Sequence, residues 1–385
     1  MRIPSLFLFL SAVGVCGASP AAGGGQSAAQ PILFAATWTK ETTNGINTFK
    51  LNTADGSLTP YGITPLAFGD KGLNPTYVQG SKKTSTSGEH IIYVLNRGVE
   101  KGYVSAMTLQ PDGKLEVLNT QEMKGASPAH IALSSNGKFL SVANYVGSLS
   151  LFPLNADGSI GKETFYQHFP VGSNVVKDTQ ATGHIHSTVW LPTSNRVIAA
   201  DLGSDKLLQY EVGPAKKTVK SLETVRCNPG SGPRHLVVDQ NGKFAYVTDE
   251  LSNTVSVFAI DKESNLLSSK PLASVTTLPA GFTNTSSAAD IHFSSNGQFL
   301  YVSNRGHDSI VSYKVNADGT LKALDWESSR GVTPRGFTIY GDWLIVANQG
   351  SDDMHVFKVD SKTGALTHTG KPYKVDGVVS LYVGE

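Results

Sequence analysis

Short apolar or alternating segments return along the whole chain at intervals of about 50 residues. Each is followed by turn residues and then by a second alternating segment, such as 254–258. A repeat of this length that is built from short strands predicts a β-propeller. The recurring segments end in a small polar residue at Thr37, Asn96, Asn144, Asp201, Asp249, Asn304 and Asn348.

The fifth repeat has the clearest strand pattern. We expect an inner strand over 234–238, a second strand over 244–249, a third over 254–260 and an outer strand within 271–278. Between the first two, Asn241-Gly242 predicts a two-residue type I′ hairpin.

The first repeat lacks an inner strand, because 32–37 already matches a second strand. At the other end of the chain, 378–383 remains as an unassigned strand. Pairing this segment as the innermost strand of the first blade would close the ring and remove its exposed edges. We therefore predict an all-β, seven-bladed propeller over 31–385, closed by a C-terminal strand in blade one.

The N-terminus has a different pattern. Arg2 precedes a short apolar segment at 5–15 and small residues at 17–19, which together predict a signal peptide over 1–18. Residues 19–30 then form a flexible linker. We expect a secreted, extracellular protein, free or attached to the cell wall.

Composition excludes some classes of partner. The 385 residues carry a net charge of +1, only 16% are charged, and no basic or acidic block occurs. These values argue against nucleic acid and, after signal cleavage, against membrane binding. We expect a monomer that acts on a small molecule.

We expect the functional residues at the positions where the inner strands begin and the second strands end. Strands in a blade are antiparallel, so these two positions lie on the same side, near the central channel. Most polar residues there recur from blade to blade. His186, Arg234, Glu250 and Arg305 break the repeat, and we predict that they are catalytic.

A second group at the same positions consists of His130, His235, Asn144 and Arg335, which we predict to bind substrate. The recurring Asn and Asp at strand ends are also expected to join neighbouring blades by hydrogen bonds. His184 and His186 could form a metal-binding pair, but no third ligand stands out. We expect no metal and no cofactor.

The predicted site suits a small anionic lactone or a carboxylate. Two guanidiniums can hold a carboxylate or phosphate in bidentate fashion. A carboxylate and an imidazole can act as base and acid, and an arginine can stabilise a developing oxyanion. Glu250, helped by His186, would activate water; Arg234 would polarise the carbonyl and Arg305 would anchor the substrate.

The chain resembles the seven-bladed propeller lactonases, a family that groups bacterial 6-phosphogluconolactonases with fungal carboxy-cis,cis-muconate cyclases. The similarity extends over about 31–385 and is most specific in the phrases GPRH…DEL and SNRGHDSI. It implies an active-site set of one His, two Arg and one Glu, matching His186, Arg234, Glu250 and Arg305. The family's activities are intracellular, whereas this chain has an export signal.

Three functions fit these residues. The first is a metal-independent lactonase similar to 6-phosphogluconolactonase. The second is a cycloisomerase of the carboxy-cis,cis-muconate cyclase type, for which the same residues would serve. The third is a non-catalytic secreted or cell-wall propeller that binds a glycan or a protein.

Overall fold

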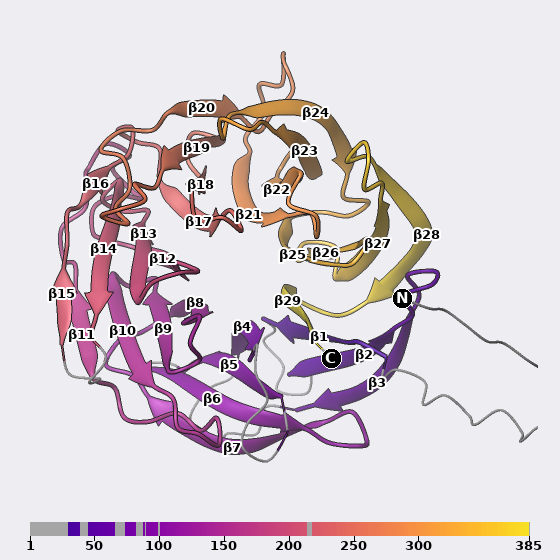
Figure 1. Ribbon diagram of the computed structural model, residues 1–385. Coiled ribbons are helices and arrows are strands. Elements are labelled where there is room, and N and C mark those ends of the chain that lie inside the picture. The colour runs from indigo at the N-terminus through magenta and orange to yellow at the C-terminus, as the bar shows by residue number, and fades with distance from the viewer. Residues whose placement is uncertain are drawn as a thin grey trace, which may run out of the picture.

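The computed structural model describes residues 30–38, 45–65, 74–81, 88, 90–98, 101–213 and 218–384. Within these ranges every regular element is a β-strand, and none is a helix that could cross a membrane. The strands form seven sheets around a central opening (Figure 1), which confirms the predicted propeller. The predicted signal peptide and all but the last residue of the predicted linker lie outside the described residues.

Blades one to four follow one another around the ring, and the strands of each run in order from the centre outward. Blade one contains β29 (Val378–Gly384), β1 (Ile32–Thr37), β2 (Ile46–Leu51) and β3 (Leu58–Thr64). Blade two contains β4 (Asn74–Gly80), β5 (Ile91–Arg97), β6 (Gly102–Leu109) and β7 (Leu115–Glu122). Blade three contains β8 (Pro128–Leu133), β9 (Phe139–Asn144), β10 (Ser148–Pro153) and β11 (Phe165–His168). Blade four contains β12 (Ile185–Trp190), β13 (Arg196–Asp201), β14 (Lys206–Val212), β15 (Val219–Ser221) and β16 (Val225–Arg226).

Blades five to seven complete the ring. Blade five contains β17 (Pro233–Val238), β18 (Phe244–Asp249), β19 (Thr254–Ala259) and β20 (Ala273–Thr276). Blade six contains β21 (Ser287–Phe293), β22 (Phe299–Arg305), β23 (Ser309–Val315) and β24 (Leu321–Ser328). Blade seven contains β25 (Pro334–Tyr340), β26 (Trp343–Asn348), β27 (Asp353–Val359) and β28 (Leu366–Lys374).

The two ends of the chain meet in blade one. Strand β29 pairs antiparallel with β1, with Leu381 opposite Ala35 and Tyr382 opposite Phe34. Leu381 also belongs to the hydrophobic cluster that joins blade one to Trp343 of blade seven. The predicted closure by the C-terminal strand is therefore confirmed.

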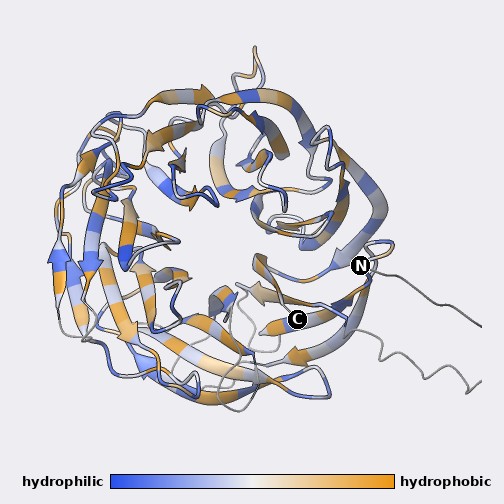
Figure 2. Cartoon of the chain, in the orientation of Figure 1, coloured by the Kyte–Doolittle hydropathy of each residue, from blue (hydrophilic) through white to orange (hydrophobic). Residues whose placement is uncertain are grey.

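The core lies between neighbouring blades. Middle strands such as β9 are buried along their whole length, whereas outer strands such as β24 are mostly exposed. Hydrophobic and hydrophilic residues accordingly alternate along the outer strands (Figure 2). Three buried tyrosines also link blades, because their hydroxyls donate to hairpin carbonyls of the next blade. These bonds run from Tyr93 to Gly158, from Tyr246 to Gly319 and from Tyr301 to Gly364, at 2.9–3.0 Å.

The recurring polar residues at the strand ends have two kinds of partner. Asn304 and Asn348 donate to carbonyls of the preceding blade, those of Thr277 and Ser329, as predicted. Other strand ends bond to a hydroxyl within their own blade instead. These are Asn96 to Ser105, Asn144 to Ser150, and Asp249, which accepts from Ser256.

The hairpin at Asn241-Gly242 is not the predicted type I′ turn. That turn needs positive φ at both residues, whereas only Gly242, at +66°, has one. The amide of Gly242 donates to the carbonyl of Asp239, and the Asp239 carboxylate accepts the amides of Lys243 and Phe244. This side chain stabilises a wider turn, which leaves the flanking strands in the predicted places.

Candidate active site

A cavity of about 310 Å³ lies on the ring axis, on the side where the inner strands begin. Every blade contributes to its lining, which is consistent with this central position. Trp38 comes from blade one, Arg97 from blade two and Tyr145 from blade three. Glu250 and Arg305 come from blades five and six.

A β-bulge in each inner strand directs side chains into this cavity. The pairing register of every inner strand shifts at its cavity end, so one or two residues there have no partner in the ladder. Bulges reorient side chains and are common beside active sites. The unpaired residues that line the cavity are Thr76, Ala129, His186, Arg234, His235, Asp290, Arg335 and Val379.

Glu250 lies between two arginines. Its Oε2 is 2.8 Å from Nε of Arg234 and 3.0 Å from Nη2 of Arg305. The side chain of Arg234 is only 2% exposed, against 18% for Glu250 and 15% for Arg305. A buried guanidinium needs a compensating charge, and Glu250 supplies it.

The charges of this trio are fixed by one another. Burial opposes ionisation of Glu250, but Arg305 and Arg234 outweigh it and lower the pKa of the carboxyl below its usual value. Burial and the neighbouring Arg305 lower the pKa of Arg234 to about 9, so it is still protonated at neutral pH. Nη1 of Arg234 and Nε of Arg305 are buried with no hydrogen-bond partner among the described residues. Their hydrogen-bonding capacity is therefore not used by any described residue.

Three imidazoles lie together beside the arginines. The ring of His235 is 5.2 Å from that of His130 and 5.1 Å from that of His186, centroid to centroid. Burial holds the pKa values of His130 and His186 well below the ordinary value, and the charge of Arg234 adds to the shift at His186. Both rings are therefore neutral at neutral pH.

The cavity also contains an aromatic ring close to two more arginines. The guanidinium carbon of Arg97 lies 5.1 Å from the Trp38 ring centre, and that of Arg335 lies 5.6 Å from it. Burial and the charge of Arg305 lower the pKa of Arg335 to about 10, so it too is charged at neutral pH. In the described part of the chain, neither Arg97 nor Arg335 has an ion pair with a carboxylate.

The comparison with known proteins agrees with this architecture. The model of the family described as "Lactonase, 7-bladed beta-propeller" matches residues 32–383. The chain belongs to this lactonase family.

Relatives in the lactonase family are similar over nearly their whole length. A 6-phosphogluconolactonase of Formosa agariphila is 35% identical over 91% of this chain and 98% of its own. A 6-phosphogluconolactonase of Bacillus subtilis is 32% identical over 87% of this chain and 93% of its own. Among solved structures, a periplasmic gluconolactonase of Pseudomonas aeruginosa has a TM-score of 0.82 and 31% identity, covering 92% of this chain and 99% of that one.

Most of the predicted site residues of this lactonase-family propeller converge. The cavity is lined by His186, Arg234, His235, Glu250, Arg305 and Arg335. His130 lies one layer behind, between the rings of Tyr77 and His235.

Asn144 does not belong with the others. Its side chain is fully buried, donates to Ser150 and does not line the cavity. As the last residue of β9 it bonds within its own blade, as do Asn96 and Asp249 at the same repeat position.

Several cavity residues were not among the predicted site residues, including Arg97, Asp290 and Trp38. Arg97 and Asp290 occupy the same strand-end and strand-start positions as the predicted residues, so the repeat could have identified them. Trp38 follows β1 directly and carries no comparable signal. In the described part of the chain, no three His, Cys, Asp or Glu side chains are grouped so that they could hold a metal ion.

Proposed function

We propose that this protein hydrolyses a small anionic lactone derived from a sugar. The observation that carries the proposal is the contact of Glu250 with both Arg234 and Arg305 at the cavity wall. The names of the relatives, 6-phosphogluconolactonase and gluconolactonase, support the same reaction class.

The charge of the cavity favours an anionic substrate. Four arginines line it, Arg97, Arg234, Arg305 and Arg335, against the two carboxylates of Glu250 and Asp290. An excess of guanidinium groups attracts phosphate or carboxylate and can bind it bidentately. In our proposal Arg97 and Arg335 hold the acidic group, and the sugar packs against the Trp38 ring close to them.

Arg234 and Arg305 would activate the lactone. Arg234 and Arg305 have buried donors without partners among the described residues, and these can bind the carbonyl oxygen. Charge that develops on this oxygen during attack would be stabilised by the two guanidiniums. Glu250 keeps both arginines in place as an ionised carboxylate.

Hydrolysis also needs a group that removes a proton from water. Glu250 with His186 is the pair predicted from the sequence. Both guanidinium contacts of Glu250 use Oε2, so this carboxylate is already engaged as the counter-ion of Arg234 and Arg305. An imidazole is therefore favoured for this step.

We also propose that the enzyme acts outside the cytoplasm. The support is the predicted signal peptide over 1–18, together with the periplasmic location in the name of the similar Pseudomonas protein. A lactone that reaches this compartment, rather than a cytoplasmic intermediate, would then be the natural substrate. Protease protection in intact and in permeabilised cells tests the location.

An indicator assay of acid release tests the function. Wild-type protein should hydrolyse 6-phosphogluconolactone and other acidic sugar lactones faster than the spontaneous reaction. Glu250→Gln should lose this activity, whereas Glu327→Gln, which alters an Arg–Glu pair outside the cavity, should retain it. If the folded wild-type protein releases no acid from any lactone, the proposal is wrong. Muconates and glycans would then test the cyclase and binding alternatives.

A further inference from the structure

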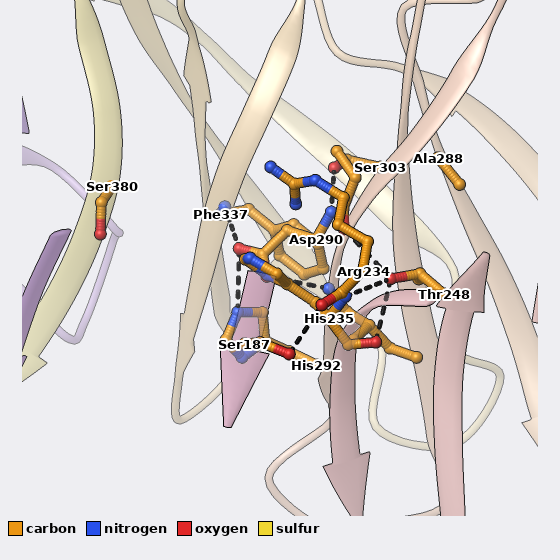
Figure 3. A network of polar contacts seen from close by, with 12 residues as sticks. Ser187, Arg234, His235, Thr248, Ala288, Asp290, His292, Ser303, Phe337 and Ser380 are labelled. Carbon is orange, nitrogen blue, oxygen red and sulfur yellow. Dashed lines mark hydrogen bonds and ion pairs between the residues drawn. The ribbon is translucent and has the colours of Figure 1, made fainter. Parts of the chain in front are cut away.

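Asp290 fixes the orientation of His235 at the cavity floor. The Nδ1 of His235 lies 2.8 Å from Oδ1 of Asp290, and both side chains are buried. The same carboxylate also accepts the amide of Phe337 at 3.0 Å and contacts Nε2 of His292 at 3.2 Å (Figure 3). Asp290 is therefore held by blades five, six and seven together.

The carboxylate determines which nitrogen of His235 carries the proton. Burial opposes ionisation of Asp290, yet His292 and His235 hold its pKa well below the usual value, so it is an anion and accepts hydrogen bonds. Nδ1 of His235 must then be the protonated nitrogen, and Nε2 keeps a free lone pair. Nε2 is buried with no partner among the described residues.

Two other proton acceptors of the cavity, Glu250 and His186, lack this arrangement, and His292 contacts the same carboxylate at the longer distance of 3.2 Å. Oε2 of Glu250 is engaged by two guanidiniums. Nδ1 of His186 is buried and has no hydrogen-bond partner within the described chain. A histidine that is oriented by a carboxylate and has its second nitrogen unengaged has the geometry of a general base.

His235 is also close to the reacting group expected in this cavity. It follows Arg234 in the same bulge of β17, and both residues line the cavity. If Arg234 binds the lactone carbonyl, a water molecule near the carbonyl carbon falls within reach of the neighbouring imidazole.

We propose that His235, oriented by Asp290, removes the proton from the water molecule that attacks the lactone. This inference rests on the proposed lactonase function. The water oxygen bonds to the carbonyl carbon while its proton moves to Nε2, and the carbonyl oxygen becomes an oxyanion. When the ring C–O bond breaks, the leaving oxygen takes the proton back from the imidazolium. The product is the open hydroxy acid, which ionises and releases one proton.

The surroundings keep His235 in its basic form. Burial and the charge of Arg234 lower the pKa of His235 to about 4, although Asp290 opposes the shift. Nε2 is therefore free to accept a proton at any pH above about 4, and the activity of the wild type should not fall until that range is reached. The titratable and charged groups that face this imidazole are Tyr77, His130, His186, Arg234, Asp290 and His292.

Kinetics of variants at both members of the pair test the inference. In Asp290→Asn the turnover number should fall by about 10²- to 10⁴-fold with little change in KM, as expected when a general base loses its orientation. His235→Gln, whose side-chain amide can still donate to Asp290, should lower the turnover number by a similar factor. The double variant should lose no more than either single one, because the two residues act as a unit. Added imidazole should restore part of the activity of His235→Ala, which a purely structural role would not allow.

Asp353→Asn is the matched control, because Asp353 is a buried carboxylate beside His355 in blade seven, outside the cavity. It should leave turnover unchanged. If the wild type is active and the folded His235→Gln variant has a turnover number within threefold of the wild-type value, this inference alone is overturned. That result is decisive even if Asp290→Asn does not fold. Losses that multiply in the double variant also overturn it. A wild type that hydrolyses no lactone overturns the proposed function and this inference together.

Discussion

Arg234 and Glu250 each directly follow one member of a residue pair in blade five. Pro233 pairs with Asp249 in the β17–β18 ladder; Arg234 is the next residue of β17, Glu250 is the first residue after β18, and both line the cavity. Their charged groups meet at 2.8 Å. The ladder thus places an arginine and its counter-ion at one point without a long flexible loop, which favours a preorganised site.

Arg234→Gln should lower the turnover number by about 10²- to 10³-fold, because a donor to the developing oxyanion is lost. KM should change much less. The control is Arg330→Gln, which removes an arginine paired with Glu327 on the outside of blade six. Steady-state kinetics decide the matter: a change confined to KM would show that Arg234 binds substrate without acting in the transition state.

Arg335→Gln should remove the preference for an anionic substrate. Loss of a charged hydrogen bond should raise KM for a phosphorylated lactone about tenfold or more. KM for the uncharged lactone should stay within about twofold, because that substrate has no acidic group for Arg335 to bind. Parallel kinetics on the two substrates measure this difference. Equal changes for both lactones would place the acidic group elsewhere.

Asp249→Asn should stabilise the protein at neutral pH. Burial raises the pKa of Asp249 to about 6, so the folded state holds this proton more tightly than the unfolded state does. The stability that this bound proton contributes is fully present below the pKa of Asp249 in the unfolded state and is lost as the pH rises through about 6. At pH 7 the variant should gain about 2–3 kcal/mol in free energy of unfolding. Asparagine already occupies this repeat position in other blades, as Asn304 and Asn348.

Urea unfolding of both proteins between pH 4 and pH 8 checks this prediction. The two curves should nearly coincide at pH 4 and separate with increasing pH. A constant difference between them would mean that Asp249 does not titrate as described.

Leu381→Ala should weaken the closure of the ring. This side chain is 8% exposed and packs in the cluster that joins blades one and seven. Its truncation should cost about 2–4 kcal/mol. Leu324→Ala, at a position that is 40% exposed, should change the free energy of unfolding by no more than about 0.5 kcal/mol. Equal effects in thermal unfolding would argue against a structural role for the C-terminal strand.

The architecture could be predicted because it depends on period and strand pattern. The strand ends from Thr37 to Asn348 and the pairing of β29 with β1 follow from counting repeats. The turn at Asn241-Gly242 could not be predicted, because the side chain of Asp239 decides its geometry from outside the dipeptide.

The site was predicted less completely, for a physical reason. Residues such as Arg335 reach the cavity through β-bulges, which interrupt the alternation of side chains that a strand pattern assumes. Arg97 shares its repeat position with Glu250 and Arg305, whereas Asn144 shares its position with Asn96, so a closer comparison of the repeats separates the cavity residue from the one that bonds within its own blade. The repeat could not show that Asp290 orients His235 from the next blade.

The most direct test of the proposed function is the initial rate of acid release by the wild-type protein from 6-phosphogluconolactone and from uncharged gluconolactone, each corrected for spontaneous hydrolysis. We expect saturable catalysis of both reactions, with a higher kcat/KM for the phosphorylated lactone and competitive inhibition by 6-phosphogluconate. A well-folded protein that leaves both rates at their spontaneous values would contradict the proposed function.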